Sequence, residues 1–296
     1  MAVRAQEAAG LEPIVDGRYG PDGPFAAGAD AWTGWSGPLS VAGWRSAAAL
    51  TDRAVKQALP GPYSLARATA RREPELEPLA ARIADGLARE IDALAAAGCP
   101  LVEIEEPEAH RIGDHEVHRG AFLAAHQRLS GAGAGTHLSL SITGGSAWAA
   151  GAETILGAPY ASLAVDLIAG PDNWRLVAVA PQDRGIIAGG LSPMLGSDDA
   201  PEILLYAANY AAATQARGSS RVGLAVAGSL ANLTWEQALW KLGRLAAGVR
   251  LASLPPGDEL AAAVDPRAIN IRSAAYGRPM PERPPAGRSR RRRGRG

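Results

Sequence analysis

Seven short apolar or alternating segments recur along the chain, separated by longer stretches that carry helical periodicity. Runs of four to eight residues rich in Val, Ile and Leu are typical of strands inside a sheet. Their regular alternation with helices predicts a parallel sheet covered by helices. The predicted strands are residues 13–17, 55–62, 100–107, 136–143, 162–168, 185–191 and 221–228.

Three of the intervening segments carry clear helix signals. In residues 74–98, Leu and Ile fall three or four positions apart, which gives one apolar stripe. Residues 234–254 begin with Thr234 and Gln237 at the spacing of a capping box. Residues 201–217 begin with a proline, which suits the first turn of a helix.

Two architectures surround a parallel sheet with helices, the doubly wound fold and the closed barrel. A doubly wound nucleotide-binding fold carries a glycine-rich phosphate loop after an early strand, and the sequence has none there. We therefore predict a TIM-type (β/α)8 barrel, whose functional groups lie at the carboxyl ends of the strands. Those ends carry Asp16 and Arg18, Glu105 and Glu106, and Asp166.

Composition narrows the class of protein further. The 296 residues are 47% hydrophobic and 20% charged, which is typical of a globular chain. No apolar run is long enough to span a membrane, and the N-terminal residues lack a signal-peptide pattern. The single cysteine, Cys99, excludes an internal disulfide, and it reads as a small buried hydrophobic residue. A cytoplasmic location is expected.

The net charge of zero hides an asymmetry between the body of the chain and its end. Residues 278–296 contain eight Arg and one Glu, a net charge of +7, so residues 1–277 carry −7. We expect residues 1–277 to form the barrel and residues 278–296 to form a disordered basic tail. The tail suits contact with a polyanion. The alternative is a solvated tail without a partner.

The order of motifs resembles the C-terminal catalytic barrel of the cobalamin-independent methionine synthases and their shorter single-barrel relatives. The closest stretches are VKQALPGPYSLA at residues 55–66 and IDALAAAGCPLVEIEEPE at residues 91–108. The family has Lys-x-x-Leu-x-Gly-Pro and Ala-Ala-Gly followed by Ile-Asp-Glu-Pro in these places. The resemblance extends over residues 8–254. It implies methyl transfer from a methylated folate, or another carrier, to a small thiol or related acceptor.

The resemblance also implies a zinc ion that activates the acceptor thiol. The matching positions are His137, Ser139, Asp166 and Gly228, so both cysteine ligands of the family are replaced. We expect the zinc-thiolate site to be lost and no cofactor to be needed, with methylated folate as a co-substrate. His137 and Asp166 are then the catalytic candidates, as general bases for an acceptor that is already acidic.

Four residues are predicted to bind a substrate that carries an amine or a carboxylate. Glu105 takes the place of the family's acid that holds the substrate amine, and Glu106 follows it as in the family. Arg18 replaces a family glutamate, and Asp16 lies two residues before it. A structural alternative stays open, in which the acids hold a neighbouring loop or pair with Arg18.

Two further alternatives concern the protein as a whole. The family's first strand would precede residue 1, so we expect seven strands in place of eight, or a barrel that closes differently. The loss of both cysteines favours a non-catalytic relative that binds a ligand or a partner through the barrel mouth. A barrel of the uroporphyrinogen decarboxylase type shares the architecture, but none of its motifs occurs here.

Three more segments have a functional and a structural interpretation each. His110, His115 and His118 suit either a metal site or a solvated polar loop. The Trp-rich residues 31–44 suit either a flat aromatic pocket or an ordinary loop over the barrel. Residues 141–148 offer backbone N–H groups and hydroxyls to an anion, or form a plain turn.

Overall fold

The computed structural model describes residues 1–16, 23–195 and 199–264. The predictions for Arg18 and for residues 278–296 lie outside the described residues. Within the described ranges, no helix has both the length and the apolar composition needed to cross a membrane.

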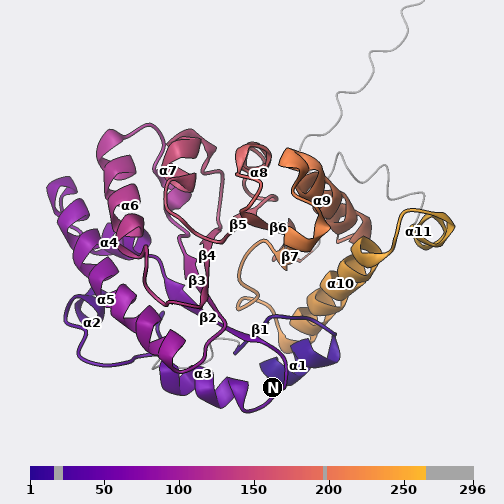
Figure 1. Ribbon diagram of the computed structural model, residues 1–296, viewed down its shortest axis with the longest axis horizontal. Coiled ribbons are helices and arrows are strands. Elements are labelled where there is room, and N and C mark those ends of the chain that lie inside the picture. The colour runs from indigo at the N-terminus through magenta and orange to yellow at the C-terminus, as the bar shows by residue number, and fades with distance from the viewer. Residues whose placement is uncertain (17–22, 196–198, 265–296) are drawn as a thin grey trace, which may run out of the picture.

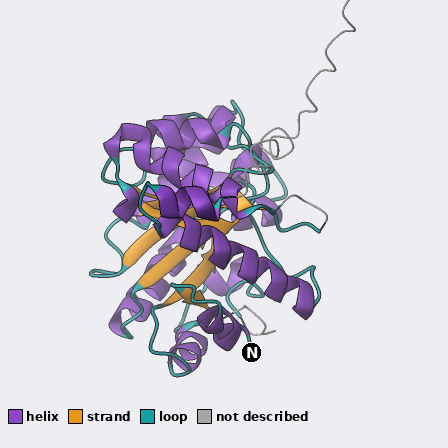
Figure 2. Cartoon of the chain, turned by 90° about the vertical axis from the view of Figure 1, so that its right-hand side faces the viewer, coloured by secondary structure: helices purple, strands orange, loops and turns teal. Residues whose placement is uncertain are grey.

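The seven predicted strands are confirmed, and they form one parallel sheet in chain order (Figures 1 and 2). The sheet curves into a half-barrel, and among the described residues no pairing joins its last strand to its first. The fold is therefore of the TIM type with seven strands. The strands are β1 (Ile14–Val15), β2 (Val55–Pro60), β3 (Leu101–Glu105), β4 (His137–Ile142), β5 (Ser162–Asp166), β6 (Gly185–Leu191) and β7 (Val222–Val226).

The helices lie on the outer face of the sheet (Figure 1). All three predicted helices are present, as α5, α9 and α10, and the capping box at Thr234 is formed in both directions. The helices are α1 (Ala2–Ala8), α2 (Ala29–Thr33), α3 (Val41–Ala48), α4 (Pro62–Thr69), α5 (Leu76–Ala96), α6 (Glu116–Arg128), α7 (Ala152–Leu156), α8 (Asn173–Val179), α9 (Pro201–Ala213), α10 (Trp235–Ser253) and α11 (Asp258–Ala263).

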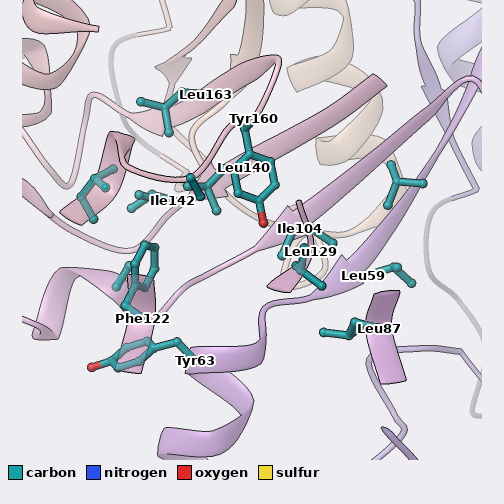
Figure 3. Packing of buried hydrophobic residues seen from close by; sticks show 14 of the residues in the cluster. Leu59, Tyr63, Leu87, Ile104, Phe122, Leu129, Leu140, Ile142, Tyr160 and Leu163 are labelled. Atoms are coloured by element: carbon teal, nitrogen blue, oxygen red, sulfur yellow. The ribbon is translucent and has the colours of Figure 1, made fainter. Parts of the chain in front are cut away.

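The main hydrophobic core fills the layer between the sheet and its helices (Figure 3). Alternate strand residues such as Ile104 and Leu140 point outward and pack against helix residues such as Leu87 and Phe122, all fully buried. Each such side chain contributes about 1.5 to 3 kcal/mol by leaving water. The other set of alternate residues faces the barrel interior.

The interior face is unusually small and polar for a barrel, whose centre is ordinarily filled by branched apolar side chains. Glu103, Ser139 and Ser162 lie directly opposite one another on β3, β4 and β5. Lys56 of β2 reaches Glu103, with 2.7 Å between Nζ and Oε1. Short side chains leave the interior incompletely filled.

The Trp-rich stretch belongs to the core and not to a ligand pocket. Trp32 is fully buried, and Trp44 donates its indole N–H to the carbonyl of Val55, at the first residue of β2. That is the amino end of the strand, opposite the barrel mouth. The buried carboxylate of Glu90 holds the same stretch by accepting from Trp35 Nε1 and from the amide of Ser40. The aromatic-pocket interpretation is therefore wrong for Trp32 and Trp44.

Candidate functional site

The barrel interior contains a cavity of about 1730 Å³ that extends from the amino to the carboxyl ends of the strands. At the carboxyl end, called the barrel mouth below, β3, β4 and β5 contribute polar side chains. β6 and β7 line the cavity with Gly and Ala and with the branched apolar residues Ile, Leu and Val. The mouth residues that line it include Glu105, Ser141, Thr143, Asp166 and Gly228.

Glu105 lies where the sequence predicts, at the last residue of β3. Its neighbours in the sheet are Pro60 of β2 and Ser141 of β4. Because strand side chains alternate between faces, the outward position of Ile104 turns Glu105 toward the interior. Glu105 is partly exposed and lines the cavity. Its assignment as the group that binds an amine stays a prediction.

Glu106 points the opposite way and is fully buried. Its carboxylate lies at the amino end of α4, where Oε1 accepts from the amide of Tyr63 at 2.9 Å and Oε2 from that of Ser64 at 2.7 Å. These two N–H groups have no partner within the helix, and the negative charge of the carboxylate interacts favourably with the positive end of the helix dipole. Glu106 therefore caps the amino end of α4.

A third donor completes the surroundings of Glu106. His126 of α6 lies with Nε2 at 2.9 Å from Glu106 Oε1, and its Nδ1 lies 2.6 Å from the Tyr160 hydroxyl. A carboxylate only accepts, so Nε2 carries the proton and Tyr160 donates to Nδ1. A Cβ at Gly61 would lie within 2.1 Å of the Glu106 carboxyl carbon, so only glycine fits there. These contacts are those of the structural alternative, in which the acid holds a neighbouring segment, and binding of substrate by Glu106 stays a prediction.

Asp166 ends β5, lines the cavity and organises two loops of the mouth. Oδ1 accepts from the amides of Ile168 and Ala169 at 2.8 Å each, and Oδ2 accepts from the amide of Gly144 at 3.2 Å. Burial raises the pKa of Asp166 despite these hydrogen bonds, which lower it. Asn173 accepts from the amide of Ala147 in the same β4 loop. Two of the N–H groups considered for anion binding are thus already engaged.

His137 lies at the opposite end of the barrel from Asp166. Ser139 of β4 and Ser162 of β5 are paired and serve as a reference level along the strands. His137, the first residue of β4, lies two residues before that pair, and Asp166 lies four residues after it. At 3.3 Å a residue this separates them by about 20 Å along the strands. His137 instead contacts Ser162, with 2.8 Å from Nε2 to Oγ, and burial lowers its pKa. His137 and Asp166 therefore do not lie in one site, and their roles as catalytic residues stay predictions.

The remaining predicted positions are scattered. Ser139 is fully buried in mid-strand, and its Oγ has no hydrogen-bond partner among the described residues. Gly228 lies at the mouth, two residues after β7. Asp16 directly follows β1 and is partly exposed. Cys99 is buried two residues before β3, and burial raises the pKa of its thiol, as suits a small hydrophobic residue.

From the sequence, Ser141 and Thr143 were considered only as part of residues 141–148, an anion site or a plain turn. Ser141 lies in β4 and Thr143 directly follows it, and both line the cavity at the mouth. The signal was present, because the alternate residues His137, Ser139, Ser141 and Thr143 are all polar and therefore share one face. The functional site of a barrel lies at the carboxyl ends of its strands, so the two residues nearest that end, Ser141 and Thr143, are the ones expected at the mouth.

The mouth residues do not fit the zinc ion that the family resemblance implies. Ser141 and Thr143 offer hydroxyls, Asp166 offers a carboxylate already engaged by three amides, and Gly228 offers no side chain. Zinc prefers thiolates and imidazoles, and no Cys or His lines this end of the cavity. In the described ranges, no three His, Cys, Asp or Glu side chains are grouped to hold a metal, those of residues 108–120 included.

A seven-stranded half-barrel of the TIM type, with its polar groups at the carboxyl ends of the strands, defines the class of protein. Within this class, residues 33–139 match the model of the cobalamin-independent synthase catalytic domain. The resemblance to the cobalamin-independent methionine synthases is thereby confirmed for a part of the chain that includes both of the closest motifs. A comparison with curated proteins found no match.

Solved structures extend the likeness in fold over most of the chain. A B12-independent methionine synthase from Shewanella sp. W3-18-1, in complex with selenomethionine, has a TM-score of 0.59 at 15% identity and covers 73% of this chain and 67% of its own. A B12-independent methionine synthase from Listeria monocytogenes, described as putative, has a TM-score of 0.58 at 16% identity, covering 84% and 83%. A methyltransferase from Methanosarcina mazei has 0.54 at 13%, covering 71% and 63%.

Proposed function

We propose that the barrel mouth binds a small amine-bearing substrate and transfers a methyl group without a zinc thiolate. The observation that carries this proposal is the inward position of Glu105 at the rim of a cavity of about 1730 Å³. It is the position at which the resemblance implies an acid that holds a substrate amine. A carboxylate there forms a charge-assisted hydrogen bond with an ammonium group. Ser141, directly opposite on β4, adds a hydroxyl beside it.

Asp166 is the general base of the proposed reaction. Burial raises its pKa above the ordinary value of an aspartate, which makes it a stronger base. Oδ2 accepts at 3.2 Å from the amide of Gly144, and a carboxylate oxygen with one such bond retains a lone pair for a proton. As the acceptor atom forms its bond to the methyl carbon, its proton passes to Asp166. The bond between the methyl carbon and the carrier nitrogen breaks, and the electron pair left on that nitrogen takes up a proton, so the carrier leaves as a neutral amine and Asp166 in turn returns its proton to solvent. A methylated folate is the carrier that the resemblance implies. The acceptor must itself be acidic, since no thiolate-rich metal site assists it.

The test is a methyl-transfer assay with labelled 5-methyltetrahydrofolate and L-homocysteine, run after chelation and again with added zinc. We expect transfer that is independent of zinc and that rises with pH through the pKa of Asp166, because the base must be deprotonated. Asp166→Asn is expected to lower the rate by about 100-fold or more. Asp172→Asn, a matched change at a largely exposed acid nearby, is expected to have no effect. Transfer that requires zinc, or that survives in Asp166→Asn, contradicts the mechanism.

The second candidate is a non-catalytic relative that binds the same class of molecule. The absence of His and Cys from the lining of the mouth favours it. It predicts binding of L-homocysteine or L-methionine to the intact protein with no transfer from any methyl carrier.

A further inference from the structure

Only two of the 30 Lys and Arg residues of the chain are lysines, and each of the two contacts a buried carboxylate. Lys241 is fully enclosed and holds Asp199, as a structural ion pair does. Lys56 differs, because its side chain is 21% exposed and lines the cavity of the barrel. Arg would supply the same charge at this place, whereas Lys also supplies an amine that can lose its proton and act as a nucleophile.

The carboxylate next to Lys56 lies at the right distance to exchange a proton with it. Lys56 is the second residue of β2, and its Nζ lies 2.7 Å from Oε1 of Glu103, whose side chain is 6% exposed and lines the same cavity. A carboxylate at this distance accepts a proton from the ammonium group and returns it in a later step. Glu105 is paired with Pro60, four residues beyond Lys56, so the ion pair lies about 13 Å along the strands from the proposed substrate site.

The layer of the barrel around Glu103 consists of short side chains on the neighbouring strands β4, β5 and β6 (Figure 1). Ser139 lies opposite Glu103, and Ser162 lies opposite Ser139. Gly185 follows on β6 and leaves space across the layer, since it has no side chain. The Ser139 hydroxyl is fully buried and has no hydrogen-bond partner among the described residues. Because such a hydroxyl is unfavourable, a ligand with a hydroxyl of its own gains a hydrogen bond here.

We propose that Lys56 condenses with a small hydroxy-aldehyde or hydroxy-ketone and holds it as a Schiff base inside the barrel. One proton of the ammonium group passes to Glu103, and the lone pair of Nζ then forms a bond to the carbonyl carbon, while the carbonyl oxygen takes up a proton from the nitrogen. Glu103 returns its proton to this oxygen, the carbon–oxygen bond breaks, and water leaves with the electron pair as nitrogen forms a double bond to carbon. The product is a protonated Schiff base beside the Glu103 carboxylate. The inference is independent of the proposed methyl transfer.

Trapping with sodium cyanoborohydride, which reduces a Schiff base to a stable amine, tests this proposal on the full chain. The protein is treated with glycolaldehyde and the reductant, and the hydroxyethyl adduct at each amine is quantified by mass spectrometry of its peptides. Arg4→Lys is the matched control, since Arg4 is 66% exposed and lies 2.7 Å from Glu7, so this variant offers a lysine beside a carboxylate at the surface. We expect Lys56 to carry at least about tenfold more adduct than the side chain introduced by Arg4→Lys in the same molecule.

Glu103→Gln is expected to lower the labelling of Lys56 at least about tenfold, because an amide does not take up the ammonium proton. Asp85→Asn, at a half-exposed acid of α5, is expected to leave the labelling unchanged. Labelling of Lys56 that does not exceed that of the side chain introduced by Arg4→Lys overturns the proposal, and this comparison does not depend on the folding of Glu103→Gln. Undiminished labelling in Glu103→Gln also overturns it. Methyl transfer has no bearing on either result, so failure of this proposal is distinguishable from failure of the proposed function.

Discussion

Replacement of Glu106 by Gln is expected to destabilise the protein by about 3 kcal/mol, because three buried donors converge on its carboxylate. The amides of Tyr63 and Ser64 and the His126 ring all donate to it at 2.7 to 2.9 Å. An amide side chain offers one acceptor oxygen and turns its NH2 group toward at least one of these donors. Unfolding in guanidinium chloride, monitored by circular dichroism, measures the change.

The matched control for this substitution is Glu108→Gln, two residues along the chain. Glu108 pairs with Arg67 at 3.2 Å and with Arg111 at 3.3 Å, and the side chains are 31%, 29% and 56% exposed for Glu108, Arg67 and Arg111. Such an ion pair contributes less than about 1 kcal/mol. A similar small effect at Glu106 would contradict the helix-cap assignment and favour binding of substrate by this residue.

Replacement of Lys241 by Met is expected to cost about 3 to 5 kcal/mol, since it leaves a buried carboxylate without its cation. Lys241 of α10 is fully buried and lies 2.6 Å from Asp199 Oδ2 and 2.6 Å from the carbonyl of Met194. Both partners belong to the connection between β6 and α9, next to the barrel mouth. The ion pair therefore fixes one wall of the candidate site to the last long helix.

The double variant Lys241→Met/Asp199→Leu separates the cost of a lone charge from the value of the pair. Removing both partners leaves no uncompensated charge, so we expect it to be more stable than Lys241→Met alone. A double variant that is less stable than the single one would show that Asp199 stabilises the fold by contacts that do not depend on Lys241. The same denaturation measurement decides between these results.

The strands were predictable because their outward faces are largely apolar, with Gln57 of β2 as an exception. In runs such as LVEI in β3 and LAVD in β5, apolar side chains that include Val102 and Leu163 pack toward the helices. This pattern can be recognised from the sequence without any tertiary information. The long helix α5 and the capping box at Thr234 are local features of the same kind. The short helices α7 and α8, of five and seven residues, have too few turns to show a period.

The sequence predicted that Glu105 and Glu106 lie at the carboxyl end of a strand, but it did not separate the role of one from the role of the other. Adjacent strand residues face opposite sides, so one carboxylate had to leave the site. The sequence does not reveal the hydrogen-bond donors around Glu106, because they are distant along the chain. The amides of Tyr63 and Ser64 lie 43 and 42 residues before it, and His126 lies 20 residues after it. His137 was misplaced for a simpler reason, since a motif match fixed the residue without fixing its level in the strand.

The most direct test of the central claim, that the barrel mouth holds a substrate amine through Glu105, is calorimetric titration with L-homocysteine and L-methionine. We expect the wild type and Glu108→Gln to bind equally, because Glu108 does not line the cavity. Glu105→Gln is expected to bind about tenfold or more weakly, the loss of one charge-assisted hydrogen bond. Unchanged affinity in Glu105→Gln, or equal loss in Glu108→Gln, would contradict the account.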